Sequence, residues 1–509
     1  FDLDRIFTEF VSPRYGEGLG LGFLTKRLQE IPSAARLILV WGSLLGSPFS
    51  FSLVQKLLTS EFLYSSEGDD VIDLTCPQNI DLIRQSKADI VVGLQYLVQT
   101  NIVIPCETDD EFRFANDRLA QAAASLTEGC HIEKMHFIIS QAIMKYYHDG
   151  RSRYAMARHV AFASPIIKSR VAQRLDYRKI LWDAAQTASQ SGARPTALSY
   201  FRHCLDLLQD SPWDDNAEDV YYDETLRLHI ATAEMAWYQG HNPEALGLLD
   251  KVFDHAKSAV CKSRAWIVKA KIYAQMGDHP RSMDSLLTCL EELGVHLREP
   301  TTYEDCDAAY SNLKEYLEKA DLMAIAHKPV SNDINMITIG SVMAETMAVT
   351  YWDDALTFYR MAIEMMNLHL FKGGFAQISI GCSHLAMISF SRFRDLELAA
   401  RLNDLALLLL ERCPEPWTQS RGSIAHNLYV SHLRVPMAAN LPALEASLEV
   451  SFSMGDPYIT LISLSSMAMA RLSLGHDMAQ LESFCNESPA AIPDWTNDTR
   501  GGATLLAVR

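Results

Sequence analysis

The strongest restriction on the fold comes from a seven-residue pattern, G-x-x-P-x-[AS]-[LM], that occurs at residues 192–198, 240–246 and 277–283. Glycine can end a helix in the left-handed conformation, and proline is favoured in the first turn of the following helix. The small residue two positions after the proline lets the two helices approach closely. The pattern therefore predicts pairs of helices joined by tight turns.

The spacing of these turns favours a tetratricopeptide-like (TPR-like) array. The last two turns lie 37 residues apart, close to the period of ~34 residues that is typical of TPR repeats. Aromatic and small residues precede the turns at 233–238 and 270–274, and weaker copies without the turn glycine occur at 351–356 and 393–400. We expect an α-α superhelix of degenerate repeats over residues 176–485.

The first part of the chain has a different pattern. It predicts helices at 34–41, 51–58 and 90–98, then two strands at 101–105 and 112–114 around a polar turn, with Asp117 capping the next helix. Helices followed by a hairpin describe a winged-helix-like domain. The predicted domains are a winged-helix-like domain at 1–130, connecting helices at 131–175, the TPR-like array at 176–485 and the start of a linker at 486–509.

Composition limits the classes of partner. The chain has 509 residues, 48% of them hydrophobic, and a formal charge of −18 that is spread over its length. Several cores or a repeat array are expected at this length. Nucleic acid and acidic lipid are poor partners for such a chain because they would be repelled. The ten cysteines stand singly, which favours reduced thiols in the cytoplasm.

Two features concern the limits of the chain and its relation to a membrane. Residues 37–55 carry no charge over nearly the length of a membrane span. Gly46 and Pro48 interrupt this stretch, so two buried helices joined by a turn are favoured over a membrane helix.

Phe1 is neither a normal start nor part of a signal peptide, and the last residues form an apolar run. We therefore expect an interior segment of a longer protein.

No motif with catalytic or metal-binding spacing is present. The glycine-rich residues 16–22 lack the Gly-Lys-Ser/Thr of a phosphate loop, so a flexible loop is favoured. The histidines do not have metal-ligand spacing, and a structural role is favoured for them. Acidic residues gather between 210 and 224; they could bind calcium or a basic peptide, but a solvated loop with helix-capping Asp is favoured.

Several segments resemble very large hybrid sensor histidine kinases with an AAA/STAND-type ATPase, and most of all their fungal members. The resemblance covers essentially the whole chain. It is carried by residues 32–36 and 41–46, by 112–123, by 191–198, and by 212–215 with 219–226.

The resemblance implies a place within a longer protein. In that family a protein-kinase-like domain and an ATPase domain precede the helical region, and a GAF domain, the histidine kinase core and a receiver follow it. This chain would hold only the tail of the ATPase module and all or most of the helical region. ATP or ADP binding and phosphotransfer are then implied for the parent protein, and no cofactor is expected in this segment.

One candidate site follows from the resemblance alone. In STAND-type ATPases a polar side chain of the winged-helix domain, commonly a His, reaches the phosphates of the bound nucleotide. The family's His-Asp-Arg is replaced here by Asn116, Asp117 and Arg118, which we assign as a candidate contact that depends on the nucleotide state. The alternative is that Asp117 caps the helix and Asn116 is a turn residue.

Three functions compete. The first is a regulatory and scaffolding segment of a hybrid histidine kinase, which couples an ATPase switch to a downstream kinase through neighbouring domains and protein partners. The second is a stand-alone TPR-type adaptor that binds peptides. The third is a STAND-like transcription regulator, which the scattered basic residues argue against. The sequence leaves the stimulus, the partners and the oligomeric state open.

Overall fold

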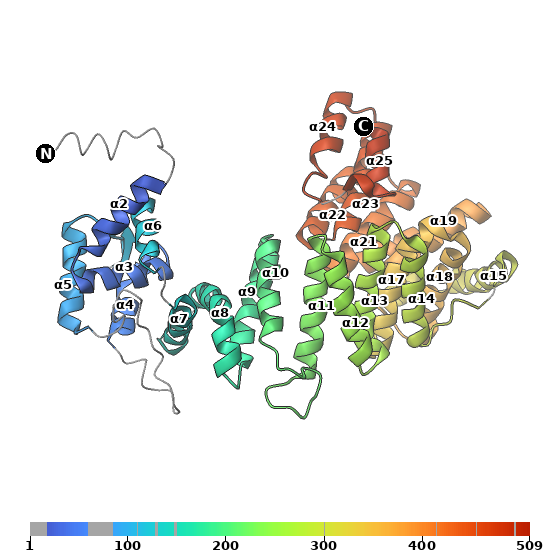
Figure 1. Ribbon diagram of the computed structural model, residues 1–509. Helices are drawn as coiled ribbons and strands as arrows, with labels where there is room; N and C mark the ends of the chain where they lie inside the picture. Colours follow the sequence, from blue (N-terminus) through green and yellow to red (C-terminus); the bar gives the residue numbers. More distant parts are fainter. Residues whose placement is uncertain are drawn as a thin grey trace. The chain divides into compact units, whose positions relative to one another are not determined.

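The computed structural model describes residues 18–59, 85–108, 110–127, 131–146, 150–299, 301–413, 415–454, 456–492 and 495–509, and these are mainly α-helical (Figure 1). The chain divides into two compact units. The first holds the described residues up to Thr187 with Ser199–Ser211 and Asn216–Val220; the second holds Ala188–Leu198, Pro212–Asp215 and Tyr221–Arg509.

The first unit opens with helices around a small sheet. Its elements are α2 (Gly18–Gln29), α3 (Ser33–Leu45), β1 (Phe49–Ser50), α4 (Phe51–Leu58), α5 (Lys87–Gln99), β2 (Val103–Pro105), β3 (Glu111–Phe114) and α6 (Asp117–Ser125). The strands are antiparallel in the order β1-β3-β2. The predicted hairpin is confirmed, with Val103 opposite Phe114. Strand β1 was not predicted, because two residues carry no alternating pattern.

The uncharged stretch at 37–55 forms part of the core of this unit. Helix α3 buries Leu37, Ile38 and Trp41, and α5 and α6 pack against it. Gly46, with a φ of 109°, ends the helix, so the predicted turn between two helices is confirmed. Among the described residues, no helix is both long and apolar enough to cross a membrane.

The expected flexible loop at the glycine-rich stretch is wrong for its described part. Helix α2 already begins at Gly18, while residues 16 and 17 lie outside the described residues. Packing of α2 against α6, with Leu28 buried, offsets the low helix propensity of the glycines.

Four helices follow: α7 (Ile132–Tyr146), α8 (Gly150–Arg170), α9 (Leu175–Gln190) and α10 (Arg194–Asp206). Helices α7 and α8 pack on each other. From residue 131 onward the described part of the chain contains no strand, apart from one isolated bridge between Val330 and Gly374, as the sequence predicts.

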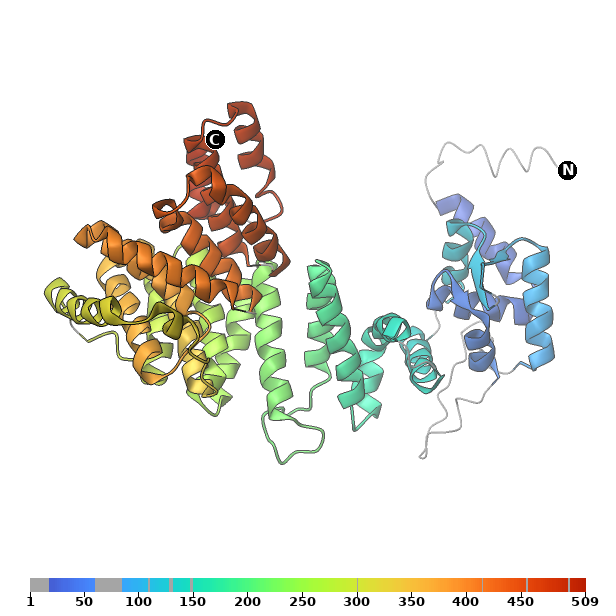
Figure 2. The same cartoon turned by 180° about the vertical axis from the view of Figure 1, so that it is seen from behind.

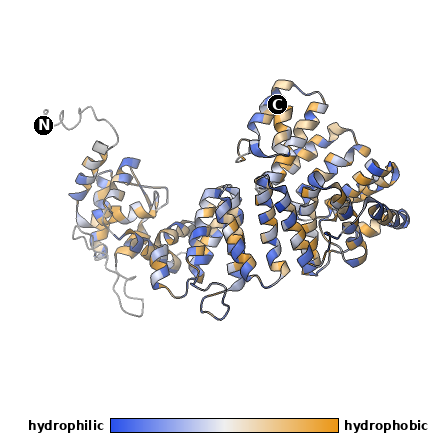
Figure 3. Ribbon diagram, turned by 45° about the vertical axis from the view of Figure 1, so that its right-hand side comes forward, coloured by the Kyte–Doolittle hydropathy of each residue, from blue (hydrophilic) through white to orange (hydrophobic). Residues whose placement is uncertain are grey.

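The second unit is an array of helices, seen from behind in Figure 2. Figure 3 shows hydrophobic and hydrophilic residues alternating along them. The long helices are α11 (Tyr222–Tyr238), α12 (Asn242–His255), α13 (Ala259–Gln275), α14 (His279–Glu292), α15 (Tyr303–Lys319), α17 (Ile334–Asp353), α18 (Ala355–Asn367), α19 (Ile378–Phe393), α20 (Leu396–Glu411), α21 (Pro416–Tyr429), α22 (Leu441–Met454) and α23 (Pro457–Ser473). Shorter elements are α16 (Leu322–Ala326), η1 (Leu368–Lys372), η2 (Ser431–Leu433), η3 (Met437–Asn440), α24 (Met478–Glu487), η4 (Trp495–Asn497) and α25 (Gly501–Val508).

The three predicted repeat turns are confirmed. Gly192, Gly240 and Gly277 have φ values of 79°, 77° and 77°. After each glycine, the next backbone N–H donates to the carbonyl five residues earlier, at 2.8–2.9 Å, which is the Schellman arrangement. The small residue of each turn, Ala197, Ala245 or Ser282, is fully buried. Helix α11 packs on α12, and α13 packs on α14.

In the weaker copy of the turn at residues 393–400, Arg394 takes the place of the glycine. This residue adopts the left-handed conformation, with a φ of 58°, where the other turns have glycine. Asp395 then caps α20 by accepting a hydrogen bond from Leu398 N–H. Ala399, five residues after Arg394 as Ala245 is after Gly240, is fully buried. The turn geometry therefore persists without the glycine.

The segment 486–509, which we expected to begin a linker, contains a packed helix. Helix α25 packs along α23 and buries Leu505. A side chain at Gly501 would lie 2.6 Å from the backbone of Leu461, so the two helices touch there. These described residues belong to the core of the second unit, and the other domain limits stay predictions.

Candidate functional site

The predicted site at Asn116, Asp117 and Arg118 lies at the start of α6, where all three residues are exposed. Asn116 is the N-cap: its side-chain Oδ1 accepts a hydrogen bond from Leu119 N–H at 3.0 Å. The prediction that Asp117 caps this helix is therefore wrong. Asn116 has extended backbone angles, as an N-cap requires, whereas Asp117 is already helical. No nucleotide contact can be read from this geometry, and that role stays a prediction.

The acidic loop is held in place by one buried ion pair in the first unit. Asp219 accepts hydrogen bonds from Arg178 Nη1 at 2.7 Å, Arg174 N–H at 2.9 Å and Gln209 Nε2 at 3.0 Å. Burial alone would raise the pKa of Asp219, but these donors hold it below its usual range. Asp219 is thus a structural residue.

No metal site is found in the part of the chain that the structure describes, since no three His, Cys, Asp or Glu side chains gather there as ligands would. His136 and His159 do meet, with their Nδ1 atoms 2.8 Å apart between α7 and α8. Burial lowers the pKa of His136 to about 4 and that of His159 to about 3. The pair is therefore neutral at ordinary pH.

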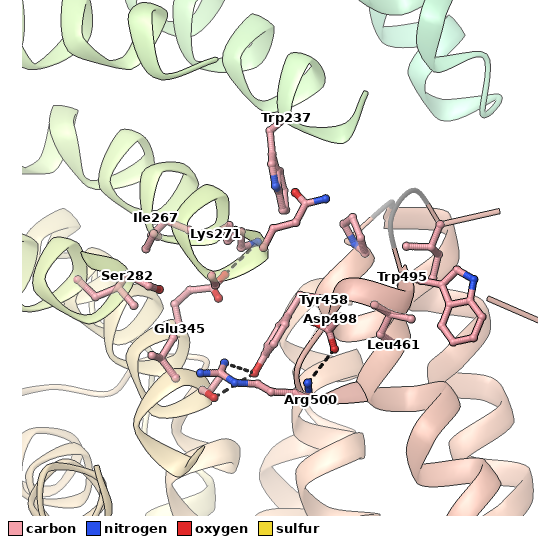
Figure 4. A pocket seen from close by; sticks show the side chains of 18 residues that line it. Trp237, Ile267, Lys271, Ser282, Glu345, Tyr458, Leu461, Trp495, Asp498 and Arg500 are labelled. Carbon is pink, nitrogen blue, oxygen red and sulfur yellow. Dashed lines mark hydrogen bonds and ion pairs between the residues drawn. The ribbon is translucent and has the colours of Figure 1, made fainter. Parts of the chain in front are cut away.

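A pocket in the second unit is a candidate site. Its walls come from α11, α13, α14 and α17 on one side and from α23 and the segment before α25 on the other. The cavity measures about 50 Å³. In Figure 4, Trp237 and Arg500 lie at opposite ends of the pocket, with Lys271 and Glu345 between them. Its apolar lining includes Ile267, Ala274, Leu286, Ala348, Val349, Pro457, Leu461 and Ile492.

Two basic and two acidic side chains form a buried charge cluster beside this pocket. Lys271 Nζ lies 2.9 Å from Asp456 Oδ2 and 3.3 Å from Glu345 Oε1. Arg421 Nη2 lies 2.8 Å from Glu345 Oε2 and 3.1 Å from Asp456 Oδ2. The four side chains are only 4–9% exposed. Their formal charges cancel, which desolvated ions require.

Asp456 links this cluster to a helix start. Burial would raise its pKa, but Lys271 and Arg421 hold the pKa well below the usual range of a carboxyl. The same carboxylate caps α23, accepting from Ile459 N–H at 3.2 Å. The sequence Asp-Pro before an apolar run is a helix-start signal that could have found the cap. Its ionic partners, far away in the chain, could not be found in this way.

Arg500 closes the other end of the pocket. Its side chain is 4% exposed and donates to Asp353 Oδ2 at 2.6 Å and to Tyr458 OH at 3.0 Å. Nη2 also lies 3.2 Å from His279 Nδ1. Arg500 thereby joins the C-terminal segment to α14, α17 and α23. We call these contacts the Arg500 clasp.

The comparisons give a distant relative. No protein-family model matches the chain. The peroxide stress-activated histidine kinase mak3 of Schizosaccharomyces pombe is 22% identical over 277 residues, which make up 54% of this chain and 11% of that protein. The matched segment thus spans a small part of the relative.

The chain also has a weak similarity to two solved structures. A STAND protein with a tetratricopeptide repeat sensor from Pyrococcus horikoshii is 11% identical, covering 97% of this chain and 62% of its own, with a TM-score of 0.34. A circular tandem repeat protein is 12% identical, covering 77% and 78%, with a TM-score of 0.14.

Proposed function

We propose that this chain is a regulatory and scaffolding segment of a hybrid sensor histidine kinase that acts in a phosphorelay. The supporting observation is the similarity to a fungal histidine kinase over 277 residues. The kinase would be cytoplasmic and would bind ATP or ADP in other domains. In this segment the described residues would transmit a conformational signal between neighbouring domains instead of transferring phosphate.

The order of helices and strands supports one role for the N-terminal domain and another for the helix pairs that follow it. The succession α3, β1, α4, α5, β2, β3 and α6, with a three-stranded antiparallel sheet, fits a winged-helix-like tail of a STAND/AAA-type ATPase module. The helix pairs that follow fit a TPR-like array. Repeat arrays bury one continuous core between neighbouring pairs, so a displacement of one pair changes its neighbours. Such an array is suited to couple an ATPase switch to a downstream kinase.

The proposal is tested on the full-length protein. We expect a Walker A motif in the encoded sequence before residue 1 and a phosphorylatable histidine after residue 509. With radiolabelled ATP, the full-length protein should label itself, whereas the isolated 509-residue chain should take up no label, because the groups that hold Mg²⁺ and phosphates are missing. Label on the isolated chain would overturn the proposal.

The second candidate is a stand-alone TPR-type adaptor that binds protein partners. The observation that favours it is the pocket between α13, α14, α17 and α23, since repeat arrays present such surfaces to peptides. The encoded sequence that flanks residues 1 and 509 distinguishes the two functions. Natural termini close to residues 1 and 509, with neither an ATPase nor a kinase motif beyond them, would favour the adaptor.

A further inference from the structure

Helix α8 is a basic element in an acidic chain. The chain carries 63 Asp and Glu residues against 45 Lys and Arg. The sequence of α8 contains no acidic residue, and its charged residues other than histidine are Arg151, Arg153, Arg158, Lys168 and Arg170. The last three are exposed, and within the described part of the chain no carboxylate lies at ion-pair distance from any of them. The positive charge of this helix is therefore available to a partner.

Two exposed aromatic side chains lie on either side of Arg158 in α8. Tyr154 and Phe162 are 41% and 52% exposed, and each stands four residues from Arg158. Residues four apart in a helix lie on the same face. The guanidinium carbon of Arg158 lies 5.9 Å from the centre of the Phe162 ring. Tyr154, Arg158 and Phe162 therefore form one exposed stripe along the helix, which we call the α8 stripe.

The two aromatic rings of the α8 stripe are held by rings of neighbouring helices. Phe162 stacks on His136 of α7, with ring centres 4.7 Å apart and planes 16° apart. Tyr154 meets Tyr200 of α10 edge-on, with ring centres 6.5 Å apart. A side chain that is already fixed in place loses little conformational freedom when a partner binds. Tyrosine and arginine are also among the residues that contribute most to protein interfaces. The stripe thus has the properties of a preformed binding surface.

The charge of α8 and that of the whole chain together limit the chemistry of the partner. A carboxylate placed at Arg158 would gain a charge-assisted hydrogen bond, and apolar side chains beside it would cover the two aromatic rings. A long polyanion such as nucleic acid would also meet the acidic remainder of the chain, whose formal charge is −18, and would be repelled there. A short acidic segment of a protein carries few charges. The stripe therefore favours an acidic peptide.

The spacing of the α8 stripe favours a helical peptide. Its three side chains follow one another at intervals of about 6 Å, because each residue of a helix rises about 1.5 Å. A second helix packed along α8 presents side chains at the same interval, four residues apart. Such a helix satisfies its own backbone hydrogen bonds, whereas an extended peptide would need a sheet edge that α8 does not offer.

We propose that the α8 stripe binds an acidic amphipathic helix of a partner protein. In this helix an apolar residue, a carboxylate and a second apolar residue would follow one another at four-residue intervals. The carboxylate would accept hydrogen bonds from Arg158, and the apolar side chains would cover Tyr154 and Phe162. Acidic residues at the end that faces Lys168 and Arg170 would pair with those cations. The site stands on α8 and its neighbours and does not depend on the proposed kinase function.

The test uses the whole 509-residue chain and fluorescently labelled peptides that are stapled as helices. The first peptide has leucine, glutamate and leucine at four-residue intervals on one face, with acidic residues at both ends. The second has the same composition with the order glutamate, leucine, leucine, and the third has lysine in place of the central glutamate. Fluorescence anisotropy should give the first peptide a Kd on the order of 100 μM, as expected for a small interface. The other two should bind at least fivefold more weakly, and equal binding of the first two would overturn the proposal.

Variants of the chain test the assigned contacts. Arg158→Glu should weaken binding of the first peptide at least tenfold and should bind the lysine peptide more tightly than the first, because the charge pair is then reversed. Phe162→Ala should weaken binding of the first peptide about three- to tenfold. Arg113→Glu changes the net charge equally at an exposed position of β3, so it is the matched control and should bind like the unmodified chain. Equal losses in Arg158→Glu and Arg113→Glu would show that only net charge matters and would overturn the proposal.

Thermal unfolding of each variant shows whether a loss of binding reflects a loss of fold. If Arg158→Glu unfolds, Arg158→Gln decides the case, because it removes the charge without introducing an opposite one. It should weaken binding of the first peptide at least threefold, and unchanged affinity would contradict the role of Arg158.

Two other occupants of the α8 stripe would give different results. A single-stranded DNA oligomer that binds more tightly than the first peptide, and is lost in Arg158→Glu but not in Arg113→Glu, would assign the stripe to nucleic acid and overturn the proposal. Sedimentation of the chain alone measures self-association. A dimer that dissociates in Arg158→Glu but not in Arg113→Glu would show that a second copy covers the stripe, which would also overturn it. The expected result is a chain whose oligomeric state is the same in both variants and that prefers the first peptide to DNA.

Discussion

At Asn116, helix capping and nucleotide contact compete for the same side chain. Its Oδ1 already accepts from Leu119 N–H, so only the amide NH₂ is left to meet a phosphate. Asn116→Ala should therefore lower the free energy of unfolding by about 1 kcal/mol, the usual cost of losing a cap. The same change at Asp117 should cost less, because Asp117 is not the cap. Chemical unfolding of the two variants measures both values.

Asn116→Asp separates the two roles, because aspartate caps helices as well as asparagine does but has no N–H to donate. If Asn116 contacts the nucleotide in the full-length protein, Asn116→Asp should keep its stability and bind ADP more weakly. Unchanged ADP affinity would leave Asn116 with capping alone.

Buried histidines make the second unit sensitive to acid. His384 is buried between Phe358 and Tyr429, and burial lowers its pKa from 6.5 to about 3. In the unfolded chain the residue takes up a proton below pH ~6.5, while in the folded chain it stays neutral. Stability is therefore fully present above that pH and is lost as the pH falls toward 3, by up to about 1.4 kcal/mol per pH unit for this group.

The measurement is the free energy of unfolding of His384→Phe and of the unmodified chain between pH 8 and pH 4. The phenylalanine keeps an aromatic ring in the site but takes up no proton, so the variant should lose less stability on acidification. At pH 8 the two proteins differ only by a packing contribution. Parallel curves over the whole range would show that His384 does not cause the acid sensitivity.

At the scale of helices, Ala245 tests the packing of a repeat pair. It is fully buried in α12, which packs on α11. Ala245→Phe should overpack this contact and lower stability by roughly 1–3 kcal/mol. Ala308→Phe, on an exposed position of α15, should change stability by less than about 0.5 kcal/mol. If both variants unfold alike, Ala245 does not lie at the closest approach of the pair.

The elements that the sequence predicts well are those whose signals are local. Gly240 and Pro243 lie three residues apart and define a turn without knowledge of the rest of the chain. The capping residue of α6 was misassigned because Asn116 and Asp117 are both good N-caps and stand next to each other. Arg394 was missed because arginine rarely adopts a positive φ. In that turn Ala399 is buried as Ala245 is in its own turn.

At the scale of the second unit, the pocket and its charges could not be predicted. Lys271 and Asp456 are 185 residues apart, and Arg500 and His279 are 221 apart. No periodicity links such residues, because their proximity depends on how several helix pairs stack. A single lysine or arginine on a helix is usually solvated, and nothing in the sequence marks these as buried.

The Arg500 clasp gives a test of how this unit is held together. Arg500→Gln removes the charge that faces Asp353 and the donor to Tyr458 OH. We expect stability to fall by about 1–3 kcal/mol, since partly buried acceptors lose their partner. Arg434→Gln is the matched control: Arg434 forms a 2.7 Å ion pair with Asp404, but both side chains are about half exposed, so its loss should cost at most about 1 kcal/mol.

Hydrogen exchange locates the effect of breaking the clasp. In Arg500→Gln, amide protection should fall first in α25 and at the start of α14, because the clasp joins these segments, while α19 and α20 keep their protection. A uniform loss over the whole unit would show that Arg500 supports the global fold and does not clasp the C-terminal helix. Exchange equal to that of Arg434→Gln would show that the contacts of Arg500 contribute no more than a surface ion pair.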